Sequence, residues 1–256
     1  KEARDAYCLA LHESDGSDPS EELEAAVHIL QFGCGEDYKV SYTVFCRLYN
    51  SGFCKEDILQ IMEGAFLAPN LKLLQRRYRK NCALLEKYPY IFRKNFLKFK
   101  DLPIRFFPYD DNSYTPYSPE EERFGDYINP GEPVIRHNFF KDLEKPVLAQ
   151  DIFSQYELEY LRDNVRRSED VGRENHVYLH YSSWEEFCAW LTCLDMKPLL
   201  EEKKLVFLFG EEMNQYPIDF KARFGIDYSQ FSLKPLRIRD INRLVWHVQL
   251  SSHNGG

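Results

Sequence analysis

Apolar and polar positions alternate most clearly over residues 176–212. Val177–Tyr181 is rich in β-branched and aromatic residues, which favour a strand. Ser183, with Glu186 three residues later, makes a capping box, so a helix is predicted to begin there. Apolar residues then recur at helical spacing, at Trp184, Phe187, Leu191 and Leu194. Leu205–Phe209 is an unbroken apolar run, typical of a buried parallel strand, so the pattern predicts a right-handed β-α-β unit.

The same alternation continues on both sides of this unit. Residues 146–150 predict a short strand, and Ser154 with Glu157 predicts the start of another helix. Residues 244–250 predict a last strand. Strands that alternate with helices are typical of a mainly parallel sheet. The predicted fold class is therefore α/β, with a mainly parallel, doubly wound, Rossmann-like sheet in a core over residues 146–256.

Helical spacing dominates the first hundred residues, so a helical N-terminal region is predicted before this core. Asp18 is followed by a proline at the first helical position, which marks a helix start. Further helices are predicted over residues 38–49 and 56–62, and a longer amphipathic helix over residues 70–87.

Residues 101–145 are predicted to form a connecting loop or lid with short elements, and Asp110–Pro133 within them is rich in Asp, Asn, Ser, Pro and Gly. Within them, residues 103–109 fit a strand edged by prolines, and Ser118 is predicted to begin one short helix. The chain begins with Lys1 and ends six residues after the last predicted strand. We therefore expect a piece of a longer protein, with the α/β core truncated at its C-terminus.

Composition and charge narrow the function classes. The net charge of −8 disfavours a general binder of nucleic acids or anionic membranes. No apolar run approaches the roughly 20 residues that a membrane helix needs. The seven cysteines include no C-x-x-C pair, which fits a reducing compartment. The composition therefore predicts a cytoplasmic protein that does not span a membrane.

Positive charge is concentrated in one stretch, over residues 70–100. Ten basic residues stand there against Glu86 alone, a local net charge of +9, which leaves −17 for the rest of the chain. Six aromatic residues are interleaved with these charges. The stretch is either a surface for phosphates or nucleic acid, or an amphipathic helix whose charges are solvated.

Ligands of open α/β sheets bind beyond the carboxyl ends of the strands. This rule selects residues after three predicted strands: Asp151, then Tyr181 and Ser182, then Gly210, Glu211 and Glu212. Glycine permits a sharp turn, and a carboxylate beside it can orient a hydroxyl or transfer a proton. Glu211 and Glu212 are therefore candidate catalytic residues, and Gly210 is a candidate for donor binding. The alternative is a turn whose charges are simply solvated.

Two histidines lie on the strand of the central unit. His176 and His180 are four residues apart, about 13 Å at 3.3 Å per residue in a strand, which is too far to bind one metal ion. We predict no metal site here. His180 lies near the strand's end and is either a general base or ligand contact, or a half-buried histidine with satisfied hydrogen bonds.

Small residues and glycines follow the last predicted strand: Ser252, His253, Asn254, Gly255 and Gly256. Such a loop can direct backbone N–H groups at a phosphate, or it can be a flexible turn. In residue order it resembles the loop with which bacterial sulfotransferases bind the 5′-phosphate of their sulfate donor. It departs from that loop in having His253 in place of lysine and a glycine in place of the usual hydroxyl residue.

The order of strands and helices also resembles bacterial glycosyltransferases with Rossmann-like halves. Together the resemblances imply a group transferase for glycosyl or sulfuryl groups, whose partner is a nucleotide-activated donor such as a nucleotide sugar. The sequence has no G-x-G-x-x-G after a strand, no Walker A motif and no G-x-S-x-G. The alternative is a non-catalytic interaction module, in which the helical region and the tyrosines Tyr114, Tyr117 and Tyr127 bind a partner protein.

Overall fold

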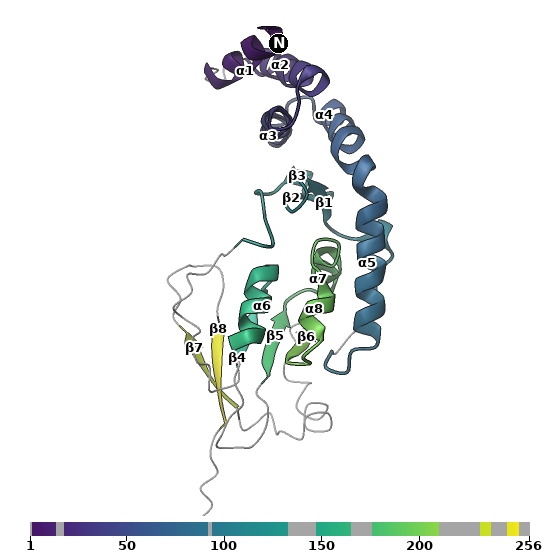
Figure 1. The fold of residues 1–256 in the computed structure, drawn as a ribbon, viewed down its shortest axis with the longest axis vertical. Helices are drawn as coiled ribbons and strands as arrows, with labels where there is room; N and C mark the ends of the chain where they lie inside the picture. The colour runs from purple at the N-terminus through teal and green to yellow at the C-terminus, as the bar shows by residue number, and fades with distance from the viewer. Residues whose placement is uncertain are drawn as a thin grey trace, which may run out of the picture. The chain divides into compact units, whose positions relative to one another are not determined.

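The computed structural model describes residues 2–13, 18–91, 94–132, 147–164, 176–209, 231–236 and 245–250. The chain divides into two units (Figure 1). The first contains Lys1–Leu74 and Pro103–Asn129, and the second contains Gln75–Leu102 and Pro130–Gly256. Each unit thus combines two separate parts of the chain. The predicted segments, in contrast, are consecutive: the first hundred residues, residues 101–145 and residues 146–256.

Helices form most of the first unit. They are α1 (Glu2–Glu13), α2 (Pro19–Phe32), α3 (Asp37–Asn50), α4 (Lys55–Met62) and the beginning of α5 (Leu71–Glu86). The predicted start at Asp18 is confirmed, because its carboxylate accepts hydrogen bonds from the backbone N–H groups of Ser20 and Glu21 at 2.9 and 3.2 Å. The helices predicted over residues 38–49 and 56–62 are confirmed as α3 and α4.

The chain runs from α4 into α5 through a π-helical turn, η1 (Glu63–Leu67), and a 3-10 turn, η2 (Ala68–Asn70). Pro69 accounts for this irregularity, because it cannot donate a hydrogen bond to the Ala65 carbonyl and its ring crowds the preceding turn. One residue earlier, the Ala68 N–H bonds to the Glu63 carbonyl, five residues back, which is the hydrogen bond of a π-helical turn. The Asn70 side chain donates to the Phe66 carbonyl at 2.9 Å, which partly repairs the turn.

A three-stranded antiparallel sheet completes the first unit. It consists of β1 (Arg105–Pro108), β2 (Tyr114–Ser118) and β3 (Arg123–Phe124), in that order. The strand predicted over residues 103–109 is confirmed as β1, but the long loop with one short helix predicted over residues 110–133 is wrong, because β2 and β3 lie there. The Ser118 hydroxyl does accept the Glu121 N–H at 3.2 Å, but in a turn between two strands. Tertiary contacts override the turn-rich composition in this segment.

Helix α3 supplies these tertiary contacts. The Asn50 amide donates to the Phe124 carbonyl at 2.8 Å and accepts the Phe124 N–H at 2.9 Å, as a neighbouring strand would. The Tyr42 hydroxyl donates to the Phe107 carbonyl at 3.0 Å. The rings of Phe107 and Phe124 are buried against α3, so one aromatic core joins the helices to the sheet.

A five-stranded sheet forms the second unit. Its strands are β4 (Val147–Gln150), β5 (Val177–Tyr181), β6 (Leu205–Phe209), β7 (Phe231–Leu236) and β8 (Val245–Leu250), in the order β6-β5-β4-β8-β7. The central prediction is confirmed, because β5 and β6 are parallel neighbours over their full lengths. Strand β4 is parallel to β5. The chain is therefore an α/β protein.

The direction of β8 corrects the prediction of a mainly parallel sheet. Strand β8 is antiparallel to both of its neighbours, β4 and β7. A return to a parallel strand needs a crossover of a dozen or more residues, whereas only residues 237–244 join β7 to β8. That length permits a hairpin but not a crossover. The sequence also fits a helix near Arg239, a position outside the described residues.

The helices between the parallel strands are α6 (Gln155–Asn164), α7 (Trp184–Trp190) and α8 (Met196–Leu200). Both predicted N-caps are confirmed, since the Ser154 and Ser183 hydroxyls accept N–H groups at 3.3 and 3.0 Å. The Gln155 amide exchanges two hydrogen bonds with the Asp195 backbone, at 3.0 and 3.2 Å, so α6 and α8 cover the same face.

Helices α6 and α8 lie on one face of the sheet, so one of the two helical layers expected of a doubly wound sheet is confirmed. The chain advances from β4 to β5 to β6 in one direction across the sheet. Right-handed crossovers that advance in one direction leave their helices on one face. The strand order does reverse at β4, because β8 and β7 lie on its other side, but the residues that join β6 to β7 lie outside the described residues.

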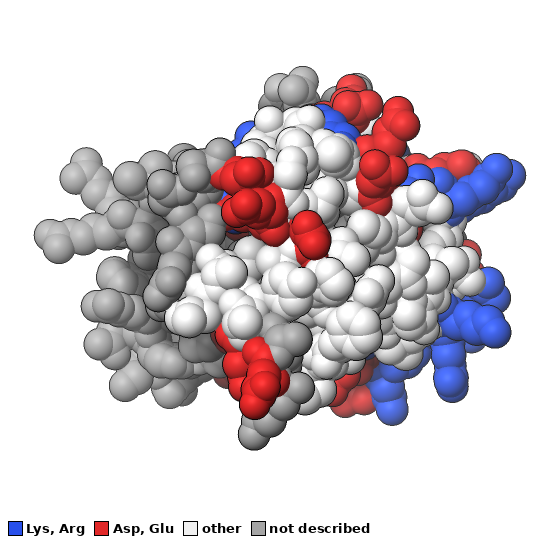
Figure 2. Space-filling model, turned by 90° about the horizontal axis from the view of Figure 1, so that it is seen from above, with Lys and Arg blue, Asp and Glu red and all other residues white. Residues whose placement is uncertain are grey.

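Residues 75–86 of α5 cover this helical layer. Asn81 is fully buried, and its amide donates to the carbonyls of Leu191 and Leu194, at 2.8 Å each. The chain after α5 extends the sheet at β6, because the Phe207 N–H bonds to the Tyr90 carbonyl at 2.9 Å. The exposed basic residues of α5 are Lys72, Arg76, Arg79 and Lys80. Figure 2 shows Lys and Arg gathered on the side where Figure 1 places α5, as expected of a solvated amphipathic helix.

Candidate functional site

The three parallel strands of the second unit end at one edge of the sheet, where Gln150 lies beside His180 and Tyr181 lies beside Phe209. Asp151 follows the first of these strands. Its carboxylate accepts the Ser182 N–H at 2.8 Å and the Ser182 hydroxyl at 2.7 Å. These two bonds hold a carboxylate and a hydroxyl together at the carboxyl edge of β4 and β5.

The backbone of Asp151 is in the left-handed region, with φ of +49°. This conformation costs a residue with a side chain on the order of 1 kcal/mol. The Asp151 N–H bonds to the His180 carbonyl at 2.8 Å, so neighbouring strands hold the turn in place. A strained carboxylate at a strand end is a reason to look for function at this edge.

Glu186 adds a second carboxyl group, from the first turn of α7. Burial raises the pKa of Glu186, and the charge of Asp151 raises it further, against a hydrogen bond from the Trp190 indole at 3.4 Å. The Trp190 ring stacks on Phe153 with centroids 4.8 Å apart, which gives this carboxyl group an apolar neighbourhood. Two carboxyl groups in different environments are the arrangement that separates an acid from a base.

The chemistry of this edge suits hydroxyl groups. Asp151 and Ser182 can accept and donate hydrogen bonds to a sugar hydroxyl, the role that an acidic residue has in dinucleotide-binding folds. Glu186 is a candidate to accept a proton, because burial and the charge of Asp151 raise its pKa. A phosphate group does not fit directly against these two carboxylates, which repel it, so the hydroxyl-bearing part of a ligand is the part that fits here.

Comparison with family models, curated proteins and solved structures gives no match to this chain. Among the described residues, no three His, Cys, Asp or Glu side chains form a group that could hold a metal ion. Within the same residues, none of the helices has both the length and the apolar character needed to cross a bilayer.

The structure places only part of the predicted site. His180 lies on β5, one residue before the strand's end, with a partly exposed side chain. Gly210, Glu211 and Glu212 lie outside the described residues, although β6, which they follow, ends at the same edge as Asp151. Their role therefore stays a prediction.

The strand that precedes the terminal loop ends at the other edge of the sheet. Residues 252–256, from Ser252 to Gly256, lie outside the described residues, but β8 places the strand end that they follow. Because Val147 lies beside His247 in antiparallel register, Leu250 is seven positions from the level of Asp151, about 23 Å at 3.3 Å per residue. The rule that carboxyl ends meet at one edge holds only for parallel strands, so the two predicted parts of the site do not begin at the same edge.

The sequence did not mark Glu186 as a functional candidate, because an acidic residue three positions after Ser183 was fully accounted for as part of a capping box. In the structure the Ser183 hydroxyl caps the helix and contacts Glu185 at 3.2 Å, whereas the Glu186 side chain accepts the Trp190 indole. A usable signal was present, since an acidic residue in the first helical turn after a parallel strand must lie at the sheet's carboxyl edge.

Proposed function

We propose that the second unit binds a nucleotide-activated donor at the carboxyl edge of β4 and β5, and that the chain takes part in glycosyl or sulfuryl transfer. The observation that supports this proposal is the strained Asp151, bonded to Ser182 and close enough to Glu186 to raise its pKa. This arrangement offers recognition of a hydroxyl and a proton acceptor at the same edge of the sheet.

The strand order supports a nucleotide as the ligand. The segment β4-α6-β5-α7-α8-β6 has the β-α-β-α-β order of one mononucleotide-binding half of a Rossmann-like fold. In such folds the ligand lies at the first strand, where the strand order turns. Asp151 follows the strand in that position, β4, because β5 and β6 lie on one side of β4 and β8 and β7 lie on the other.

The two carboxyl groups receive different roles in this proposal. Asp151, with Ser182, holds a ribose or sugar hydroxyl of the donor. Glu186 accepts the proton of the acceptor hydroxyl. At the same time the acceptor's oxygen bonds to the transferred glycosyl or sulfuryl group, the bond between that group and the donor's phosphate breaks, and the nucleotide leaves with its phosphate. Glu211, Glu212 and His180 remain predicted contributors from the two neighbouring strands.

The interaction-module alternative keeps its helical region, but two of its three tyrosines do not lie on the surface. Tyr114 and Tyr117 are buried in the first unit, and only Tyr127 of the three tyrosines is exposed, at 46%. The aromatic segment is a packed sheet, so it presents no row of tyrosines to a partner protein.

Thermal unfolding tests the proposal. A panel of nucleotides, nucleotide sugars and the adenine-nucleotide sulfate donor should contain a compound that raises Tm; a ligand at 100 times its Kd stabilises by about 2.7 kcal/mol. Asp151→Asn and Glu186→Gln should reduce this shift, whereas Glu185→Gln, at the exposed neighbouring position, should not. A flat response across the panel would contradict the proposal.

A further inference from the structure

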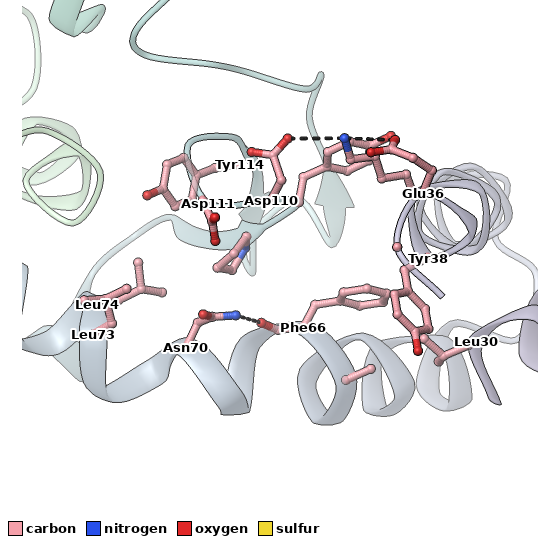
Figure 3. Close-up of a pocket in the computed structure, with 15 residues that line it drawn as sticks. Leu30, Glu36, Tyr38, Phe66, Asn70, Leu73, Leu74, Asp110, Asp111 and Tyr114 are labelled. Carbon is pink, nitrogen blue, oxygen red and sulfur yellow. Dashed lines mark hydrogen bonds and ion pairs between the residues drawn. The ribbon is translucent and has the colours of Figure 1, made fainter. Parts of the chain in front are cut away.

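A pocket of about 700 Å³ lies within the first unit, away from the residues of the proposed function (Figure 3). The turn between β1 and β2 forms one side of it, and the run from η1 into α5 forms the other. Its volume lies within the usual range of small-molecule sites. The π-helical turn contributes Phe66, and such turns are frequent at functional positions.

The floor of the pocket is apolar. Phe66 and Leu73 come from the irregular helix run, and Tyr38 comes from the first turn of α3. Leu73 is 53% exposed and Tyr38 is 39% exposed, so this apolar surface is open to solvent.

The rim of the pocket is acidic. Glu36, Asp110 and Asp111 line it, against Lys39 as its one ammonium group among the lining residues, a formal charge of −2. Lys39 is already paired, at 3.1 Å to Glu36 and 3.6 Å to Asp110. Asp111 makes no ion pair with any residue that the structure describes, and it faces the helix run across the pocket in Figure 3.

Asp110 is held in its charged form. Partial burial alone would raise the pKa of Asp110, but the Asn112 N–H, Ser113 and Lys39 together lower it. An aromatic ring of the rim also faces a cation already, because the Lys39 ammonium lies 5.6 Å from the Tyr109 centroid. Carboxylates, exposed aromatic rings and an apolar floor therefore meet in one concave site.

We propose that this pocket binds an organic cation, namely an ammonium or guanidinium group carried on an aromatic or aliphatic stem. The charge lies near Asp111, and the stem packs on Phe66 and Leu73. An anion would meet a net negative rim, and a hydrated metal ion would gain nothing from the apolar floor. The cation's source is either a free amine or a Lys or Arg side chain of a peptide.

Titration of the whole ¹⁵N-labelled chain, followed by amide NMR shifts, tests this proposal. Phenethylammonium chloride, the neutral phenethyl alcohol and the peptide acetyl-Phe-Lys-amide serve as probes. The ammonium should shift amides of the pocket lining and bind roughly tenfold more tightly than the alcohol, with an affinity that falls as salt rises. Stronger binding of the peptide than of the free amine would identify a peptide side chain as the source.

Two variants separate charge from shape. Asp111→Asn should weaken the ammonium by roughly fivefold and leave the alcohol unchanged, which is the scale of one exposed charge pair. Leu73→Ala should weaken both probes. Glu120→Gln, an exposed acidic position of the β2–β3 turn in the same unit, is the matched control and should change neither.

The proposal fails if the ammonium and the alcohol bind equally, or if Asp111→Asn behaves like Glu120→Gln. It also fails if shifted amides spread over acidic residues throughout the surface, because that pattern indicates nonspecific attraction. Since the pocket lies wholly in the first unit, none of these outcomes bears on nucleotide binding in the second.

Discussion

Replacing Asn81 with alanine should strongly destabilise the second unit. Asn81 is fully buried on α5, and its side chain makes three hydrogen bonds to the backbone between α7 and α8. Its amide nitrogen donates to the carbonyls of Leu191 and Leu194, at 2.8 Å each, and its oxygen accepts the Met196 N–H at 3.2 Å. This one side chain fixes the connection that follows the proposed site.

The loss in the free energy of unfolding depends on the buried backbone groups that the substitution leaves without a partner. A net hydrogen bond contributes about 1 kcal/mol, and a buried group left without a partner costs about 1–3 kcal/mol. Three lost bonds, with partial rescue by water, give about 3–5 kcal/mol for Asn81→Ala. That is a large fraction of the stability of a typical domain, about 5–15 kcal/mol.

Urea unfolding followed by tryptophan fluorescence measures this loss. All three tryptophans, Trp184, Trp190 and Trp246, belong to the second unit, so the signal reports on that unit alone. Lys80→Ala is the control at the neighbouring position, where an exposed pair with Asp195 at 3.3 Å should contribute at most about 1 kcal/mol. Equal, small losses for the two variants would refute the role assigned to Asn81.

Three further predictions follow from individual contacts. Glu186→Gln should raise Tm at neutral pH, because the raised pKa of Glu186 shows that the fold disfavours its charged form. This gain in Tm should disappear as the pH falls below that pKa, because the wild-type carboxyl group is then protonated too. Asn50→Ala should cost about 2–3 kcal/mol in the first unit through two lost bonds to Phe124, measured by amide hydrogen exchange, with no change in tryptophan fluorescence. Cys188 should react with a thiol reagent at pH 8 only on unfolding, since burial raises its pKa to about 12, whereas exposed Cys34 should react at once.

Local patterns predicted the parts of the fold that depend on nearby residues. The capping serines Ser154 and Ser183 begin α6 and α7 as expected, because a cap and the N–H groups that it satisfies are neighbours in sequence. The apolar run Leu205–Phe209 forms the strand beside Val177–Tyr181, as its own composition predicts. Such a run has few alternatives to burial between two layers.

The sequence failed where the deciding partner is remote. Phe124 belongs to a strand because Asn50, 74 residues earlier, satisfies both of its backbone groups. No pattern near Phe124 encodes that pairing, and the surrounding Pro, Ser and Glu residues favoured a loop. Glu186 was missed in a different way, because its environment depends on Trp190 and Asp151, which only the fold brings together.

The reversal of β8 decides how the predicted donor site must be revised. Residues 237–244 are too few to cross the sheet, so the chain turns back and Leu250 reaches the edge opposite Asp151. A phosphate bound after β8 would therefore lie about 23 Å from the strained carboxylate, farther than one nucleotide's phosphate and ribose extend. His253→Ala should accordingly leave a nucleotide-induced rise in Tm intact, while Asp151→Asn reduces it. If His253→Ala abolishes the rise and Asp151→Asn does not, the donor binds at the opposite edge, and the carboxylates at β4 and β5 serve only to hold the strand ends together.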